Sequence, residues 1–245
     1  MNNKQIVSSI FCDLSKAFDF VNHRILLSKL EQYGIGGKFQ ALINSYLKGR
    51  YQRLTITDKT NTHFSNWDLV KHGVPQGSIL SPLLFLIYIN DLPTIDKNAK
   101  LVLYADDTSL IITSSSQTEF NTKLSNVLLE VHDWFRSNLL FLNLNKTTYL
   151  QISTKNSRKL DLNITMMNNQ ITNSSYTKFL GLTIEETLSW NAHINQIMSR
   201  LNSACYAIRI ITPLMTDDTL KMVYYAYVHS IMTYGIIFGG KLTTQ

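Results

Sequence analysis

Two adjacent aspartates stand between two short apolar segments of the chain. Residues 100–104 and 108–113 are runs of strand length, and only Ala105, Asp106 and Asp107 separate them. Connections this short join neighbouring antiparallel strands, so the pattern predicts a tight hairpin with carboxylates at its tip. Aspartate is common in turns for local reasons, because it hydrogen-bonds its own backbone. Two adjacent carboxylates also repel each other, which raises a pKa or calls for a cation.

A third carboxylate lies near the end of another apolar segment. Residues 6–14 have the composition of a buried strand, and Asp13 stands close to its end. If this strand neighbours the predicted hairpin, Asp13 converges with Asp106 and Asp107. Carboxylate oxygens suit Mg²⁺, a hard cation that retains water and takes phosphate oxygens as ligands. Two such ions about 3.5–4 Å apart activate an attacking hydroxyl and stabilise a leaving oxygen.

Strand and helix patterns alternate through the first three quarters of the chain, and helical patterns fill the remainder. Helical spacing of apolar residues is seen at 23–33, 38–47, 79–90 and 117–136, and strand-like runs at 53–57, 64–70, 149–153, 162–167 and 179–184. Two further helices are expected, over about 190–211 and 217–232. The pattern predicts an α+β domain over residues 1–189 and an all-helical segment over 190–245.

Amino-acid composition gives only weak indications of the binding partners and the cellular compartment. The net charge of +6 suits a polyanionic partner, although ordinary basic proteins share it. Cys12 and Cys205 are too few for a disulfide framework, which indicates a reducing compartment. The apolar run 79–89 is shorter than the roughly 20 residues of a membrane helix, and no signal peptide pattern opens the chain. An intracellular location in nucleus or cytoplasm, without a membrane partner, is therefore expected.

Five short motifs resemble those of reverse transcriptases and occur in that family's order. They are FCDLSKAFD at 11–19, GVPQGSILSP at 73–82, YADD at 104–107, LNLNKT at 142–147 and FLG at 179–181. The pattern is most similar to non-LTR, LINE-like retrotransposons. The resemblance covers about residues 11–183. It implies a polymerase palm, an antiparallel sheet packed on helices, followed by a thumb-like helical segment, with the fingers largely absent.

The resemblance implies a metal-binding role for the three carboxylates. Asp13 and Asp106 would be the principal ligands of two Mg²⁺ ions, or of Mn²⁺ in their place. Asp107 would be the weaker or structural member, because consecutive side chains on a strand diverge. The carbonyl of Leu14 would be a backbone ligand. Lys146 would stand near the leaving pyrophosphate as charge stabiliser or general acid, with a solvated lysine after a polar turn as the alternative.

The resemblance also implies residues that contact nucleotide and primer. Phe18 would be a steric gate that leaves no room for a 2′-hydroxyl, with a core aromatic as the alternative. Gln76 and Gly77 would lie against the incoming nucleotide, because glycine permits close backbone approach; an ordinary turn before a capped helix is the alternative. Phe179, Leu180 and Gly181 resemble a short hairpin near residues 179–184 that would support the primer terminus, with a plain core strand as the alternative.

The implied activity is that of an RNA-directed DNA polymerase, which extends a DNA primer on an RNA template with deoxynucleoside triphosphates (dNTPs). Only residues 1–10 precede the first motif, whereas the family grips the triphosphate with basic residues further upstream. An upstream fingers and endonuclease region is therefore expected in a full-length element, and weak or no activity from this chain alone. The alternative function is that of a non-catalytic remnant that binds nucleic acid.

Overall fold

The computed structural model describes residues 5–153, 162, 164–167 and 169–239. Two compact units form, one from Met1–Tyr149 with Asp161–Thr172 and the other from Leu150–Leu160 with Asn173–Gln245. The hairpin around residue 180 belongs to the second unit, together with the helices that follow it. Compact units are defined by contacts and not by roles, so a functional boundary at residue 190 stays a prediction.

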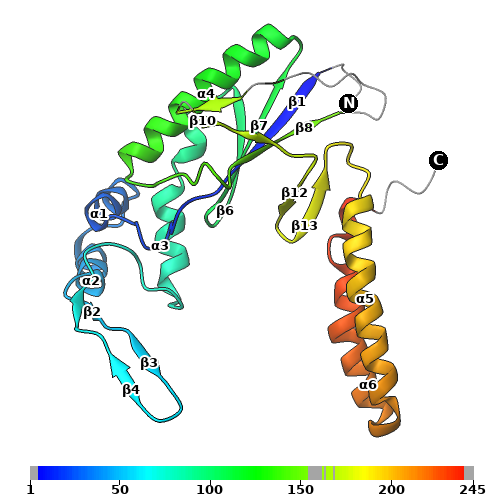
Figure 1. Cartoon of the computed structure of the whole chain (residues 1–245). Coiled ribbons are helices and arrows are strands. Elements are labelled where there is room, and N and C mark those ends of the chain that lie inside the picture. The colour runs from blue at the N-terminus through cyan, green and yellow to red at the C-terminus, as the bar shows by residue number, and fades with distance from the viewer. Residues whose placement is uncertain (1–4, 154–161, 163, 168, 240–245) are drawn as a thin grey trace. The chain divides into compact units, whose positions relative to one another are not determined.

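A five-stranded sheet holds the strands expected from the apolar segments (Figure 1). Its order is β11-β8-β1-β7-β6, and both neighbours β1–β7 and β6–β7 are antiparallel. The bounds are Ile6–Cys12 for β1, Ala99–Tyr104 for β6, Asp107–Ser114 for β7, Thr148–Ile152 for β8 and Thr172–Asn173 for β11. The predicted α+β class with an antiparallel sheet is confirmed.

One face of the central strands is buried, and the other is only partly buried. The register pairs Ser8 with Ile112, Ile10 with Leu110 and Cys12 with Thr108, and all six residues are buried. Side chains of a strand alternate between the faces, so every second pair points into the core. Burial without a charged partner raises the pKa of the Cys12 thiol to about 12, so this cysteine acts as a small apolar core residue.

Helices supply the rest of the core of the first unit. They are α1 (His23–Gln32), α2 (Gly37–Leu47), α3 (Leu80–Ile89) and α4 (Gln117–Ser137), with the short turn η1 at Leu92–Thr94. Helix α4 packs against β7 through buried residues spaced three and four apart, and α1 packs against both α2 and α3 (Figure 1). Pro82 falls in the first turn of α3, as expected, where its missing N–H costs nothing.

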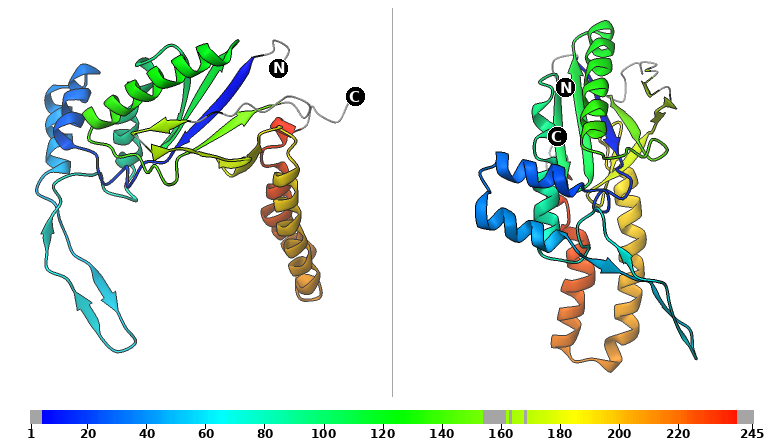
Figure 2. Two further views of the ribbon diagram at one scale, coloured as in Figure 1. Left: turned by 45° about the horizontal axis from the view of Figure 1, so that its top comes forward. Right: turned by 90° about the vertical axis from the view of Figure 1, so that its left-hand side faces the viewer.

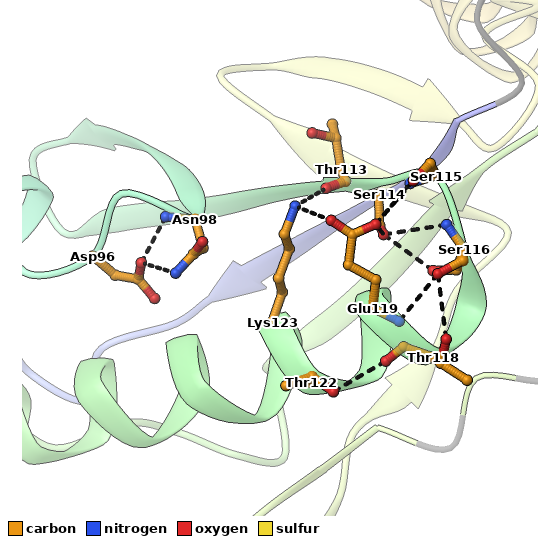
Figure 3. Close-up of polar contacts among 10 residues, drawn as sticks. All are labelled: Asp96, Asn98, Thr113, Ser114, Ser115, Ser116, Thr118, Glu119, Thr122 and Lys123. Carbon is orange, nitrogen blue, oxygen red and sulfur yellow. Dashed lines mark hydrogen bonds and ion pairs between the residues drawn. The ribbon is translucent and has the colours of Figure 1, made fainter.

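A cluster of hydroxyl groups ties the start of α4 to the end of β7 (Figure 3). Ser116 caps the helix by accepting from the Glu119 N–H. The Glu119 carboxylate accepts from the hydroxyls of Ser114 at 2.7 Å and Ser115 at 2.9 Å, and pairs with Lys123 at 2.9 Å. The Ser114 bond, then Lys123 and Ser115, lower the pKa of Glu119 to about 2. The ionised carboxylate thus fixes the junction of strand and helix.

A partly buried ion pair joins three helical segments, and no pattern in the sequence predicts it. Lys29 of α1 lies 2.6 Å from Asp91 and also donates to the Tyr88 carbonyl at 2.6 Å. Its ammonium stands 4.6 Å from the ring centroid of Trp134 on α4, whose indole N–H donates to Asp91. Tyr88 donates in turn to the Asn138 carbonyl at 2.5 Å. Each residue is ordinary alone, so only the fold reveals the network.

Between α2 and α3 the chain forms a two-stranded arm (Figure 2). Strand β3 (Thr55–Thr57) pairs with β4 (Thr62–Phe64), and β2 (Tyr51–Gln52) pairs with β5 (Asp68–Leu69). The predicted single strand over 64–70 is therefore wrong. Ser65 interrupts it by accepting from the Leu54 N–H through its hydroxyl and donating its own N–H to the Leu54 carbonyl, which separates the two ladders.

The second unit contains a hairpin followed by a series of helices. Strands β12 (Tyr176–Phe179) and β13 (Leu182–Glu185) form the hairpin, and α5 (Asn191–Ile211) packs against β13. Helix α6 (Asp217–Tyr224) passes into a π-helical turn at Tyr225–His229, followed by α7 (Ser230–Thr233) and α8 (Ile236–Gly239). The expected helix over 217–232 is thus interrupted. Among the described residues, every helix is too short or too polar to span a bilayer.

Of the strand expected over 162–167, only part can be compared with the structure. Thr165–Met166 forms β9, which pairs with β10 (Asn169–Gln170), and residue 163 lies outside the described residues.

Stability in acid should depend on Glu119. Its folded pKa lies below the usual value, so its contribution is present above about pH 4.5 and is lost as the pH falls towards 2. Urea unfolding of Glu119→Gln should show a smaller loss of stability between pH 7 and pH 3 than the parent shows. Glu130→Gln, an exposed position on the same helix, is the matched control. Equal losses in the parent and Glu119→Gln would contradict the assignment.

Removing Asp91 should leave Lys29 as a buried, unpaired charge. The Lys29 side chain is 9% exposed and that of Asp91 42%, so Asp91→Asn should cost about 2 kcal/mol, less than a fully buried pair. Adding Lys29→Met should recover most of this loss, because methionine suits a site between aromatic rings. Denaturant melts of the single and double variants test both statements. A double variant no more stable than Asp91→Asn would refute the account.

Candidate active site

The register of the central strands places the three carboxylates at one end of the sheet. Cys12 pairs with Thr108, so Asp13 and Asp107 follow at the same edge on adjacent strands. Tyr104 pairs with Asp107, which makes Ala105 and Asp106 the two residues of the turn. The hairpin is as predicted, except that Asp107 already belongs to β7. Sequence positions far apart are thereby brought together.

The three negative charges interact across this edge. The pKa of Asp107 is raised, first by partial burial and then by the charges of Asp106 and Asp13. A divalent cation among them would remove that repulsion. In the described part of the chain, His, Cys, Asp and Glu side chains form no preassembled site of three or more ligands. Mg²⁺ commonly takes one or two carboxylates and completes its shell with water and substrate phosphates, so this donor set fits the ion.

The turn itself holds an unfavourable backbone conformation. Ala105 has φ of 50°, in the left-handed region that two-residue hairpin turns use and that glycine adopts most readily. A residue with a Cβ pays roughly 1–2 kcal/mol there. The surrounding ladder of β6 and β7 enforces this conformation, which fixes the direction of Asp106 beside it.

A polar segment lies along Asp13 and brings Lys146 to it. The Asp13 carbonyl accepts from the Asn143 N–H at 2.8 Å, and the Asn143 carbonyl accepts from the Lys146 N–H at 3.1 Å. The Lys146 ammonium then lies 4.0 Å from Asp13 Oδ2, with 70% of the side chain exposed. Such an exposed pair contributes little stability, and the lysine is free to move towards a phosphate. Its role stays a prediction.

The backbone of Leu14 faces away from this segment. Leu14 and Leu142 form an antiparallel bridge whose hydrogen bonds run from Asn143 to Asp13 and from Ser15 to Phe141. In such a pair the N–H and C=O of the bridged residue itself point to the other side of the strand. The Leu14 carbonyl is therefore directed away from residues 141–143. That direction is compatible with its expected role as a backbone ligand.

Phe18 combines features of both interpretations given for it. Its ring stacks on Phe85 of α3 with centroids 4.6 Å apart and an angle of 27° between the planes. Phe85 is fully buried, whereas Phe18 is only partly buried. One face of the Phe18 ring thus packs on the core, and part of the side chain remains accessible.

The loop before α3 is clamped against the segment that follows Asp13. The Val74 N–H donates to the Phe18 carbonyl at 2.9 Å, and the Gly73 N–H to the Val21 carbonyl at 2.8 Å. Gly73 has φ of 88°, and a Cβ there would stand 2.7 Å from the Asp19 carbonyl oxygen. Gln76 and Gly77 are exposed at the end of this loop, with Gly77 at φ of 79°. Any residue larger than glycine at 73 would open the clamp.

A cavity of about 650 Å³ lies beside this loop. Its lining includes the cationic or titratable side chains of Lys16, Arg50, Lys71 and His72, together with Asp19 and Gln76. Asp19 is the last residue of the first motif and His72 immediately precedes the second, but neither was expected among the site residues. Contact across the clamp is the only sign of them.

The FLG motif forms the tip of the β12–β13 hairpin in the second unit. Leu180 and Gly181 have φ of 48° and 77°, the positive pair that a tight two-residue turn requires. The Tyr234 hydroxyl donates to the Leu180 carbonyl and its ring lies against Gly181. The short hairpin that the resemblance implies near residues 179–184 is confirmed, whereas the single strand expected over 179–184 from its apolar residues is wrong. Contact of Phe179, Leu180 and Gly181 with a primer stays a prediction.

Comparison with known proteins agrees with the motifs. Solved telomerase structures from Candida tropicalis share the fold: one in complex with a fragment of telomeric RNA has a TM-score of 0.51 at 13% identity, covering 100% of this chain and 41% of that one. The apo form has a TM-score of 0.50 at 14% identity, covering 75% and 32%.

Relatives in sequence are RNA-directed DNA polymerases of mobile elements. The probable polymerase of transposon BS from Drosophila melanogaster is 26% identical over 249 residues, and that of mobile element jockey from Drosophila funebris is 25% identical over 252. They cover 98% and 96% of this chain, which spans about a quarter of their length, 27% in both cases. The model of the family "Reverse transcriptase (RNA-dependent DNA polymerase)" matches residues 1–184. The chain belongs to the reverse transcriptase family.

Proposed function

We propose that this chain is the catalytic core of an RNA-directed DNA polymerase from a non-LTR retrotransposon. The observation that carries the proposal is the convergence of Asp13, Asp106 and Asp107 at one end of the sheet, where partial burial and then the charges of Asp106 and Asp13 raise the pKa of Asp107. Template RNA, a DNA primer and dNTPs are the proposed partners, which implies an intracellular location.

The reaction joins a primer to a nucleotide. The primer 3′-oxygen attacks the α-phosphorus of the dNTP, a P–O bond forms, the bond to pyrophosphate breaks, and the hydroxyl proton passes to solvent water. Two Mg²⁺ ions, when bound, would activate the hydroxyl and stabilise the leaving oxygen. Asp13 and Asp106 would hold them, with Asp107 and the Leu14 carbonyl in support.

The chain's own side chains would orient and select. Lys146, exposed and next to Asp13, would neutralise charge on the pyrophosphate or donate a proton to it. Phe18 would exclude a 2′-hydroxyl with its accessible edge, while Phe85 supports the ring from below. The cationic side chains lining the cavity beside Gln76 suit a triphosphate.

Replacing Asp106 by Asn should reduce primer extension on an RNA template by at least about a hundredfold, because it removes a charged ligand from the site of developing charge. Asp58→Asn, at the tip of the β3–β4 arm, changes the net charge equally and should leave extension intact. If Asp106→Asn extends primers as well as the parent, the metal assignment is wrong. RNA binding retained by an inactive parent chain would favour the non-catalytic alternative.

Substituting Phe18 by Val should relax the choice of sugar. The preference for dNTPs over ribonucleotides should fall by roughly tenfold or more, the discrimination that one shaped contact supplies. Phe20→Val removes a nearby ring that packs on Phe141 and His72, and should leave the preference unchanged. Single-nucleotide incorporation with matched dNTP and rNTP measures both. An unaltered preference in Phe18→Val would leave this ring only its packing role on Phe85.

A further inference from the structure

A side-chain hydrogen bond joins two of the family motifs. The Gln76 amide nitrogen donates to Asp19 Oδ1 at 2.8 Å. An ionised carboxylate accepts hydrogen bonds and donates none, so Asp19 favours one of the two amide orientations. In that orientation Nε2 faces Asp19, and the side-chain carbonyl oxygen of Gln76 faces away from it.

The backbone of Asp19 is held in place independently of its side chain. Its carbonyl oxygen lies 2.7 Å from His72 Nδ1, and its N–H donates to the Lys16 carbonyl at 2.9 Å. Gly73 presses against the same peptide, with the backbone bonds of Phe18 and Val21 on either side. Truncating the Asp19 carboxylate therefore removes the bond to Gln76 and leaves the clamp between the two segments in place.

Gln76 needs such an anchor because it is exposed and has several rotatable bonds. A free glutamine side chain samples many rotamers, and fixing it when a substrate binds costs conformational entropy. Groups held beforehand in the productive geometry avoid that cost at the moment of binding. The bond to Asp19 supplies this preorganisation on the side of the loop that adjoins the cationic cavity.

We infer that Asp19 is a positioning residue that sets the amide orientation of Gln76 and so tunes selection of the incoming dNTP. This inference rests on the proposed polymerase function for its kinetic consequence. The positioning of Gln76 by Asp19 itself does not depend on turnover.

Side-chain amide NMR tests the positioning directly. The Gln76 NH₂ signals, assigned by their loss in Gln76→Ala, should shift and exchange faster with solvent in Asp19→Ala. They should stay unchanged in Asp68→Ala, because Asp68 is a carboxylate on the lining of the same cavity that accepts instead from the Leu69 N–H. Signals that do not respond to Asp19→Ala overturn the inference.

Steady-state primer extension tests the consequence for nucleotide selection. Asp19→Ala should raise KM for the dNTP by about tenfold, the loss of one hydrogen bond to a charged group, with kcat within about twofold of the parent. The KM of Asp19→Asn should lie between those of the parent and Asp19→Ala, because the amide oxygen of asparagine still accepts from Gln76. In a Gln76→Ala background, Asp19→Ala should have no further effect.

The outcomes separate the two proposals. A parent chain that extends no primer defeats the proposed function, while the NMR response of Gln76 still decides whether Asp19 positions it. An active parent in which Asp19→Ala and Asp68→Ala raise KM alike would show that only the charge of the cavity matters. Additive effects of Asp19→Ala and Gln76→Ala would likewise reject a role for Asp19 through Gln76.

Discussion

The pairing of β1 with β7 is the constraint on which the candidate site depends. Cys12 lies opposite Thr108, so Asp13, which follows Cys12, and Asp107, which precedes Thr108, lie at the same edge of the sheet. A slip of one residue would turn one strand's carboxylate to the opposite face of the sheet. The buried pairs Ser8 with Ile112 and Ile10 with Leu110 oppose such a slip, because it would expose the core side of the strand. Core packing and site geometry are thus one and the same requirement.

The four family motifs that lie in the first unit are also physical neighbours. The segment after Asp13 hydrogen-bonds on one side to residues 141–143 and on the other to the loop at Gly73 and Val74. Lys146, Phe18 and the loop ending at Gln76 are therefore attached to a single stretch of backbone. A small displacement of that stretch would move Asp13, Phe18 and the loop together.

Local patterns were enough to predict most elements of the first unit. The hairpin at 105–107 and the helices around 23–33 and 117–136 follow from apolar periodicity and short turns, which need no tertiary information. The break at Ser65 and the π-helical turn at Tyr225–His229 did not follow, because each is set by pairing or packing with distant residues. The Lys29–Asp91 ion pair and the Asp19–Gln76 hydrogen bond could not be predicted for the same reason. Both contacts join residues that are far apart in the sequence, and local composition does not show which residues the fold brings together.

The clamp between Phe18–Val21 and Gly73–Val74 has a consequence for how this chain can vary. The clamp joins the two ends of the segment that contains α1, α2 and the β3–β4 arm. This segment, the excursion, therefore begins and ends at the clamp. The entropic cost of closing a longer loop grows only slowly with its length. Lengthening or shortening the arm would therefore leave the spacing between Phe18 and Gln76 untouched. The β3–β4 arm can therefore change in length, while the clamp at the base of the excursion keeps its geometry.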